Sequence, residues 1–291
     1  MNENLLAGAK EKTVIFDGAM GTLLMAAGLS PGETPELWNL EKPDVVMDIH
    51  RRYFEAGSDV VHTNTFGGNP LKLADRGLEE KMELINSEAA KIAKEVCPEG
   101  KFVAGDIGPT GKMLKPLGDV TPEEMETCFH SQAAALIRGG ADLISIETMF
   151  SMEEALLALK GAKRAGDLLV AASITYTKTK SGFFTMMGEG VVQSVSALEE
   201  TGADVIAANC TLGSQDMISL TKEIRAATKK PILIQPNAGK PITRNGVTQY
   251  RQTPSEFAQD GRHLKEAGAD MIGGCCGTDP EFIRELSKAV G

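Results

Sequence analysis

Four copies of one short pattern recur along the chain, and each copy joins a helical segment to an apolar run. The copies are AGSDVVHTN from Ala56, GGADLISIE from Gly139, TGADVIAAN from Thr201 and AGADMIGGC from Ala267. The Gly suits the left-handed conformation that ends many helices. The runs that follow are short, continuous and rich in Val and Ile, which predicts parallel strands buried on both faces.

Four further apolar runs alternate with these copies. They are TVIFD, FVAGD, LLVAASIT and ILIQPN, at residues 13–17, 102–106, 168–175 and 232–237. Between the runs, Thr121, Ser151 and Thr253 each begin a capping-box pattern, and Pro follows two of them at the first helical position. Eight alternating strand–helix units predict a (β/α)₈ TIM barrel; a doubly wound open sheet is the alternative, but the four-fold repeat favours closure.

We expect residues 1–291 to form a single domain, because no linker, charge block or low-complexity stretch interrupts the pattern and one helix follows the last strand. The composition, 42% hydrophobic and 24% charged, is that of a globular protein. A net charge of −10 argues against nucleic acid or an anionic membrane as the main partner. No membrane span or signal peptide is evident, and five cysteines, two of them adjacent, do not fit a disulfide framework. We therefore expect a cytoplasmic protein.

The chemistry of a TIM barrel lies at the carboxyl ends of its strands. In this chain those ends carry Asp17, Thr63-Asn64, Asp106, Glu147, Thr175, Asn209-Cys210, Asn237 and Cys275-Cys276. Asp, Asn and Thr also favour turns, so their presence alone decides little. Three thiols at two neighbouring even-numbered strands are less easily explained by turn chemistry.

Cys210 follows the sixth strand and Cys275-Cys276 follow the eighth, so the three thiols should meet over one quadrant of the barrel mouth. Neighbouring residues of a strand point to opposite faces, so the pair shares a metal only if the chain leaves strand geometry; the surrounding glycines permit this. Three thiolates on Zn²⁺ leave one tetrahedral position open, as in a catalytic site. Such a zinc suits delivery of a bound thiol as a nucleophile better than activation of water.

Other interpretations of the cysteines remain open. The trio would be structural if its members were simply buried, and Cys275 and Cys276 would be redox-active if they formed a vicinal disulfide. For Cys97, before a proline, and Cys128, within a predicted helix, we expect a structural role.

Several longer segments carry a family resemblance. They are DGAMGT from Asp17, NTFG from Asn64, GDIGPTG from Gly105, Glu147-Thr148, Asn209-Cys210, PNAGKP from Pro236 and GGCCGTDP from Gly273. Together they resemble the homocysteine S-methyltransferase family, and within it the sequence is most similar to the homocysteine-binding module of cobalamin-dependent methionine synthase. The resemblance implies a TIM barrel that holds zinc on Cys210, Cys275 and Cys276.

The resemblance also implies roles for residues beside the metal. Asp17 and Glu147 would hold the ammonium group of homocysteine, and backbone N–H groups from Gly18 onward would receive its carboxylate. Asn237 matches the family position that occupies the fourth zinc site when homocysteine is absent. From the residues alone, Asp17 could instead cap a helix, and Asp106 is expected to organise a loop rather than to bind substrate.

The sequence therefore predicts methyl transfer to the zinc-bound thiolate of homocysteine, giving methionine. The expected donor is a methylcorrinoid, methylcobalamin, on a separate protein, because no corrinoid module follows the barrel. Asp48-x-His50 resembles the start of a corrinoid-binding D-x-H-x-x-G, but Tyr53 replaces the Gly, so we expect His50 to be a solvated helix residue.

Alternatives remain for the activity. The methyl donor could be S-methylmethionine, betaine or another onium compound, and the acceptor could be a different thiol. The chain could also be a non-catalytic subunit that binds zinc and thiol for a partner. An aldolase-type barrel is disfavoured, because no lysine ends a strand to form a Schiff base. No nucleotide-binding glycine motif is present.

Overall fold

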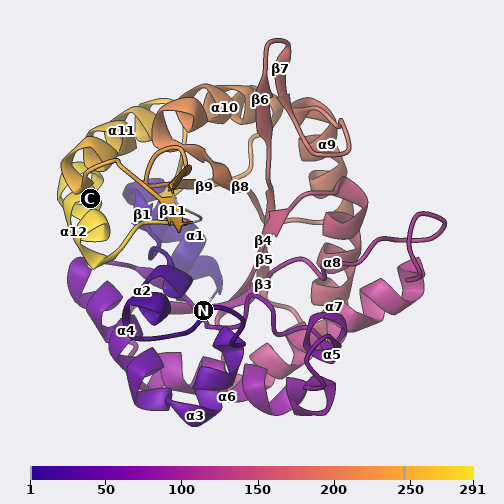
Figure 1. The fold of residues 1–291 in the computed structure, drawn as a ribbon. Coiled ribbons are helices and arrows are strands. Elements are labelled where there is room, and N and C mark those ends of the chain that lie inside the picture. The colour runs from indigo at the N-terminus through magenta and orange to yellow at the C-terminus, as the bar shows by residue number, and fades with distance from the viewer. Residues whose placement is uncertain (1, 245–246) are drawn as a thin grey trace.

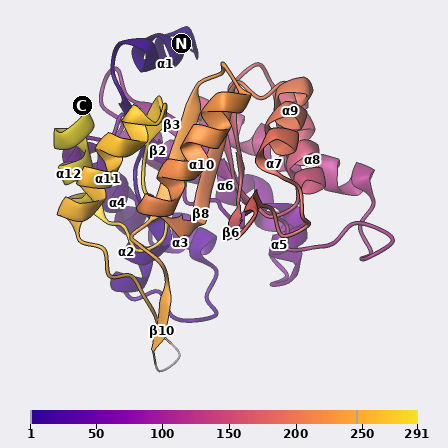
Figure 2. The same ribbon diagram turned by 90° about the horizontal axis from the view of Figure 1, so that it is seen from above.

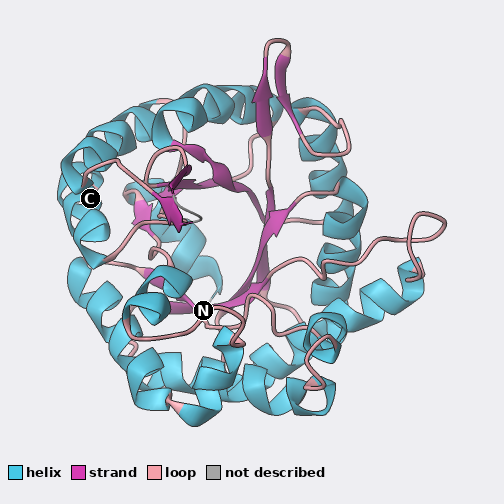
Figure 3. Ribbon diagram, viewed as in Figure 1, coloured by secondary structure: helices cyan, strands magenta, loops and turns pink. Residues whose placement is uncertain are grey.

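The computed structural model describes residues 2–244 and 247–291. Eight parallel strands form one sheet in the order β1-β12-β9-β8-β5-β4-β3-β2. Their bounds are β1 Val14–Ile15, β2 Val60–His62, β3 Phe102–Ile107, β4 Leu143–Met149, β5 Leu169–Ile174, β8 Val205–Gly213, β9 Ile232–Asn237 and β12 Met271–Ile272. A parallel bridge between Phe16 and Val60 joins the two ends of the sheet and closes it (Figure 3). The predicted (β/α)₈ barrel and its eight strands are confirmed.

Helices surround the barrel as an outer ring (Figure 1). Those up to β4 are α2 Met20–Ala26, η1 Pro35–Leu37, α3 Trp38–Glu41, α4 Pro43–Ala56, α5 Pro70–Ala74, η2 Glu79–Lys81, α6 Met82–Glu95 and α7 Pro122–Gly139. The later ones are α8 Met152–Ala165, α9 Val191–Thr201, α10 Ser214–Ala227, α11 Pro254–Glu266 and α12 Pro280–Val290. Their buried faces and the outward faces of the strands form the larger hydrophobic core.

Three elements were not expected from the sequence. Helix α1 (Asn2–Glu11) lies across the amino-terminal end of the barrel, where Leu5 packs into the barrel's inner core (Figure 2). Two hairpins, β6 (Thr177–Thr179) with β7 (Gly182–Phe184) and β10 (Ile242–Arg244) with β11 (Val247–Gln249), lie outside the main sheet. The β10–β11 hairpin projects from the end opposite α1, so the two ends of the barrel are built differently (Figure 2).

The four-fold repeat has a structural reason at the amino-terminal end of the barrel. Its glycines adopt left-handed φ values of 98° to 109° just after a helix; they are Gly57, Gly140, Gly202 and Gly268. Each aspartate of the repeat accepts a hydrogen bond, at 2.8–2.9 Å, from a backbone N–H of the barrel strand that precedes it in the chain. The aspartates are Asp59, Asp142, Asp204 and Asp270. Each carboxylate also pairs with a Lys or Arg. The repeat thus secures strand ends far from the mouth, which is a role in stability.

Two of the three predicted capping boxes are complete. Thr121 and Thr253 each cap their helix reciprocally with a Glu three residues later. The prediction is wrong for the third, because Ser151 accepts from Glu154 but the Glu154 side chain turns away. Its carboxylate instead accepts from the backbone and the hydroxyl of Thr110, at 2.8 and 2.7 Å. A tertiary contact with the loop after β3 has replaced the local cap.

The inside of the barrel is divided into an apolar half and a polar half. Side chains that face inward recur every second residue along a strand. The first inward positions are apolar and form the inner core with α1; they include Val60, Ala104, Leu143, Val205 and Leu233. The inward positions nearer the mouth are polar and buried; they include His62, Asp106, Ser145, Ser173, Asn209, Gln235 and Asn237. This polar layer is the floor on which a site at the mouth rests.

His50 is not the solvated residue that we expected. It lies on the inner face of α4, is completely buried, and neither ring nitrogen has a hydrogen-bond partner among the described residues. Burial, with a smaller effect of His62, lowers the pKa of His50 to about 3. The expectation failed because the helix turns this position toward the core beside Ile49 and Tyr53.

His50 should make the fold sensitive to acid. Its pKa is about 3 in the folded chain and about 6.5 in the unfolded chain, so the unfolded state binds the extra proton between these values. Stability should therefore fall as the pH drops below 6.5, by up to ~1.4 kcal/mol per pH unit from this group. The variant His50→Leu should show a flatter dependence when urea unfolding is measured at pH 7 and pH 5. Parallel curves for the two proteins would contradict this assignment.

In residues 2–244 and 247–291, every helix falls short of the length or the apolar character that crossing a bilayer requires.

Candidate metal centre and substrate pocket

Three cysteine sulfurs meet at the carboxyl end of the barrel. The Sγ atoms of Cys210, Cys275 and Cys276 all lie within 4.8 Å of one another, and those of Cys210 and Cys276 are 4.0 Å apart. Sulfurs that share a tetrahedral zinc at about 2.3 Å are separated by roughly 3.8 Å. The three thiols therefore fit a metal ion with small adjustments of their side chains.

The backbone leaves strand geometry to bring the thiols together. Cys210 itself adopts a left-handed φ of 60°, and Thr211 follows at 51°, which costs energy for residues with a side chain. On the other side β12 ends at Ile272, so Cys275 and Cys276 lie in the turn beyond it. Residues other than glycine that adopt left-handed φ values are concentrated at functional sites. Here that conformation accompanies the meeting of Cys210 Sγ with the other two sulfurs.

Of the glycines around the cysteine pair, only one has the unusual φ value that we expected of them. Gly277 has a left-handed φ of 82°. Gly273 and Gly274 do not, but a Cβ on Gly273 would lie 2.7 Å from the Cβ of Phe16, and one on Gly274 would lie 2.4 Å from Thr278 Oγ1. These two positions need Gly for close packing rather than for unusual φ values.

The thiols influence one another strongly. Hydrogen bonds from Cys210 and Cys275 lower the pKa of Cys276 to about 3. The same contacts, with burial, raise the pKa of Cys275 well above its ordinary value. The crowded, partly buried trio therefore resists losing more than one proton. A bound cation would offset the repulsion between the thiolates and so favour their deprotonation.

Asn237 lies beside the cysteine pair. Its neighbours on both sides bond to the pair's backbone, because Cys275 N–H donates to Pro236 O at 2.8 Å and Ala238 N–H donates to Cys276 O at 3.0 Å. The Oδ1 atom of Asn237 is buried and has no hydrogen-bond partner among the described residues. Asn237 thus combines a buried oxygen that lacks a partner with a backbone packed against the cysteine pair.

Asn209 connects the thiols to a carboxylate. Its Nδ2 atom donates to Glu147 Oε2 at 3.0 Å and to Thr148 Oγ1 at 2.8 Å, and lies 4.0 Å from Cys275 Sγ. Its Oδ1 accepts from Thr148 N–H, which helps to hold Thr148 at a left-handed φ of 59°. The Asn209 side chain therefore fixes the distance between Glu147 and the cysteine cluster.

Asp17 is held from inside the protein. Its Oδ2 accepts from the backbone N–H of His62 at 2.8 Å, and its Oδ1 lies 2.7 Å from His62 Nδ1. The other ring nitrogen of His62 bonds to Ser145 Oγ at 3.0 Å. Burial alone would lower the pKa of His62, but the charges of Asp17 and Glu147 raise it above its ordinary value. Asp17 and His62 thus form a buried hydrogen-bonded pair, with His62 in the polar layer of the barrel.

The turn after Asp17 is packed closely. A Cβ on Gly18 would lie 2.6 Å from Thr278 Oγ1 and 3.0 Å from the hydroxyl of Tyr53, so only Gly fits. The next residue, Ala19, donates its N–H to Thr278 Oγ1 at 3.2 Å. This turn forms the wall of the pocket through Ala19, Met20 and Gly21.

A cavity of about 260 Å³ opens beside the thiols. Its polar lining consists of Glu36, Thr63, Asn64, Thr65, Asp106, Glu147, Thr148 and the three cysteines. Asp17, Gly18 and Asn237 are not among the lining residues, whereas Asp106 is. Burial raises the pKa of Glu147, and the charges of Asp17 and Cys276 add to this while His62 opposes it. The three thiols and the carboxyl groups of Asp106 and Glu147 thus line the same cavity.

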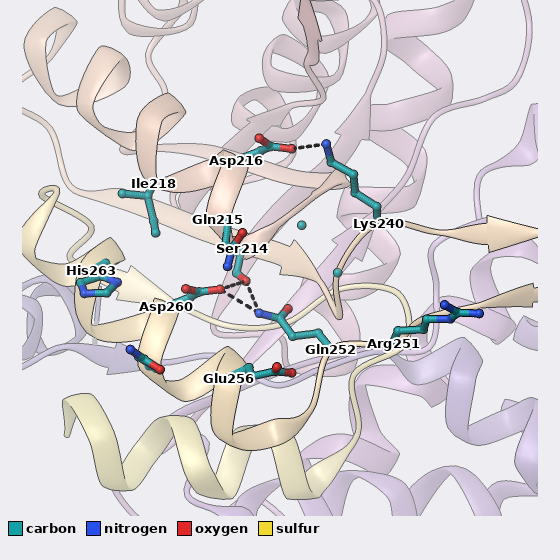
Figure 4. A pocket seen from close by; sticks show the side chains of 13 residues that line it. Ser214, Gln215, Asp216, Ile218, Lys240, Arg251, Gln252, Glu256, Asp260 and His263 are labelled. Atoms are coloured by element: carbon teal, nitrogen blue, oxygen red, sulfur yellow. Dashed lines mark hydrogen bonds and ion pairs between the residues drawn. The ribbon is translucent and has the colours of Figure 1, made fainter.

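A larger groove of about 920 Å³ lies outside the barrel, along α10 and α11 (Figure 4). Ser214 and Gln252 both bond to Asp260 Oδ2, at 2.6 and 2.8 Å, and to each other at 2.6 Å. Because Ser214 closely follows Cys210 and Gln252 follows the β10–β11 hairpin, this network joins two loops beside the thiols. The groove contains none of the cysteines, and its hydrogen-bond network ties the start of α10 to Gln252 and α11.

Cys97 and Cys128 lie away from the cluster, as expected for structural cysteines. Cys97 is partly buried at the end of α6, and Cys128 is buried in α7. Burial raises the pKa of Cys128 to about 12, so it remains a thiol.

A family model described as homocysteine S-methyltransferase matches residues 14–290. The chain is 32% identical over 305 residues to the methionine synthases of Mycobacterium leprae (strain TN) and Mycobacterium tuberculosis (strain ATCC 25618 / H37Rv). Each match covers 99% of this chain but 25% of the relative, so the chain spans about a quarter of the length of these relatives.

The fold is similar to that of a solved enzyme. The metallated form of the homocysteine methyltransferase MmuM from Escherichia coli superposes with a TM-score of 0.78 over 95% of this chain and 96% of that one. At 22% identity, this likeness concerns the arrangement of strands and helices.

Proposed function

The chain belongs to the homocysteine S-methyltransferase family, and from this premise we propose that it methylates the thiol of homocysteine to give methionine. The observation that carries the proposal is the cavity that three clustered thiols and buried carboxyl groups line together. Homocysteine has a thiol at one end and an ammonium group at the other, so the cavity offers groups that suit both ends.

We propose that Cys210, Cys275 and Cys276 hold Zn²⁺. A zinc bound by three thiolates keeps a position for the substrate sulfur and lowers the pKa of that thiol, so it reacts as a thiolate at neutral pH. Asn237, with its unsatisfied buried oxygen, would be the fourth ligand when no substrate is bound. The five free cysteines fit a reducing cytoplasm.

The chain's own residues would orient the amino acid. Glu147, held by Asn209, would receive the ammonium group, and Asp17, which bonds to His62, would add negative charge. Backbone N–H groups of the turn from Gly18 onward would receive the carboxylate. With both ends fixed, the substrate sulfur would face the open mouth, where its bond to the methyl carbon forms as the donor's bond to that carbon breaks. The electron pair of the broken bond stays with the donor.

We propose a methylcorrinoid carried by another protein as the donor. Among the described residues, seven of the nine exposed large apolar side chains lie in segments that follow strands at the mouth; they are Met25, Phe66, Met113, Leu117, Met186, Met187 and Ile242. Exposed apolar side chains in the loops around the mouth would offer contacts to a large donor carried by a protein. A small donor would not require such contacts.

The alternatives are an onium donor such as S-methylmethionine or betaine, another small thiol as acceptor, or a subunit that binds thiol for a partner without catalysis. A donor screen separates them. Zinc-loaded protein and homocysteine are incubated anaerobically with methylcobalamin, S-methylmethionine, betaine or methyltetrahydrofolate, one at a time, and methionine is measured.

We expect methionine with methylcobalamin, accompanied by the spectral change of demethylated corrinoid. Turnover with an onium donor and none with methylcobalamin would contradict the donor assignment and leave the acceptor assignment standing. Absence of methionine with every donor, including a methylated corrinoid protein, would contradict the catalytic function.

A further inference from the structure

Asp106 is a buried residue whose backbone is fixed, whose carboxyl group contacts that of Glu147, and whose Oδ1 atom has no partner among the described residues. Its N–H donates to Thr63 Oγ1 at 3.0 Å, and its carbonyl accepts from Thr65 Oγ1 at 2.7 Å. The side chain lines the cavity, the residue is 4% exposed, and Oδ1 has no hydrogen-bond partner among the described residues. A loop organiser, the role expected from the sequence, would use its carboxylate to bond the loop.

A buried carboxyl oxygen without a hydrogen-bond partner is costly to the fold. Burial raises the pKa of Asp106 well above its ordinary value, and the neighbouring charges of Glu147 and Asp17 raise it further. A buried polar atom without a partner loses its hydration without gaining a hydrogen bond, and this loss is greater for a charged atom. Such a cost is retained where a ligand satisfies the group during function.

The two carboxylates expected at the ammonium site are not equally available. Both oxygens of Asp17 are engaged by His62, and Asp17 is 1% exposed and does not line the cavity. Asp106 and Glu147 lie near the carboxyl ends of the adjacent strands β3 and β4, and both line the cavity. The carboxyl pair that faces a ligand is therefore Asp106 with Glu147.

We propose that Asp106 is a substrate-binding residue, whose carboxylate receives the ammonium group of the amino-acid substrate together with Glu147, while Asp17 fixes His62 in the floor. This inference rests on the proposed function, because it concerns the recognition of homocysteine. It assigns the specificity for an amino acid to the end of β3. A thiol without an ammonium group gains nothing from Asp106.

The test compares two thiols that differ only in that group. Homocysteine and 4-mercaptobutyrate, its analogue without the amino group, are titrated into zinc-loaded wild type, Asp106→Asn and a surface control, Asp48→Asn on α4. Hydrogen bonds to charged groups contribute about 1.5–3 kcal/mol. Asp106→Asn should therefore bind homocysteine roughly 10- to 100-fold more weakly, bind 4-mercaptobutyrate as the wild type does, and retain its zinc.

Equal weakening for both thiols would overturn the proposal, since it would indicate a structural role, and so would unchanged affinity for homocysteine. The same titration of wild type tests the proposed function separately, because failure of the unmodified protein to bind homocysteine would contradict that function itself. Asp48→Asn should match the wild type with both ligands, since its carboxylate is exposed and pairs with Arg51.

Discussion

Alanine in place of any one of Cys210, Cys275 and Cys276 is expected to weaken zinc binding by at least ~100-fold and to abolish methyl transfer. Removing a single supporting residue outside the ligands already costs metal sites about 10- to 100-fold in affinity, and here a ligand itself is lost. The remaining two thiols would also lose the cation that offsets their mutual repulsion. Zinc content after purification and competition with a chromophoric chelator measure the effect.

Cys97→Ala and Cys128→Ala are the matched controls, because they remove a thiol without touching the cluster. Both should keep about one zinc per chain. The account is wrong if a control variant loses the metal, or if one of the three cluster variants retains both wild-type zinc content and activity.

Glu147→Gln is expected to weaken homocysteine binding by about 2–5 kcal/mol while zinc content stays near one per chain. The reason is that the carboxylate, fixed by Asn209 at 3.0 Å, is a partner for the substrate's ammonium group, and the amide cannot replace its charge. By the usual conversion the affinity would fall roughly 30-fold to several thousand-fold. Isothermal titration of homocysteine into the zinc-loaded variant measures the change.

Glu153→Gln, on the exposed surface of α8, is the control for this variant and should bind homocysteine as the wild type does. Wild-type affinity in Glu147→Gln would remove this residue from the substrate site. Loss of zinc together with affinity would instead place Glu147 among the groups that hold the cysteine cluster.

Much of the fold could be predicted because parallel strands buried on both faces leave a strong pattern. The repeated Gly-x-Asp marks four helix ends and four strand starts, and its aspartates bond backbone N–H groups at the start of the preceding strands. Helix α1 and the two hairpins lack such a pattern. The apolar side of α1 is short, and its position depends on the open end of a barrel that the local sequence does not encode.

The meeting of the three thiols could also be predicted, because the ends of the sixth and eighth strands of a barrel share one side of its mouth. Which of the carboxylates faces the cavity could not be predicted. Asp17 and Asp106 both end strands, and the sequence does not tell which one faces the cavity and which one is paired. His62 decides this, since two hydrogen bonds from one residue occupy Asp17. Such pairing depends on the register of β1 against β2, which only the closed barrel fixes.

His50 and Glu154 show the same limit on a local reading. Each was assigned from neighbouring residues, as a solvated position and as half of a capping box. In the structure, tertiary contacts override both assignments: α4 turns His50 into the core, and Thr110 takes the Glu154 carboxylate.

X-ray absorption at the zinc edge, with and without homocysteine, tests the central claim most directly. The account predicts three sulfur ligands and one lighter ligand in the free protein, and four sulfur ligands at about 2.3 Å once homocysteine is added. The fourth sulfur would be that of the substrate, placed where a methyl donor can reach it. A sulfur count that does not change on addition of homocysteine, or that is below three in the free protein, would contradict the account.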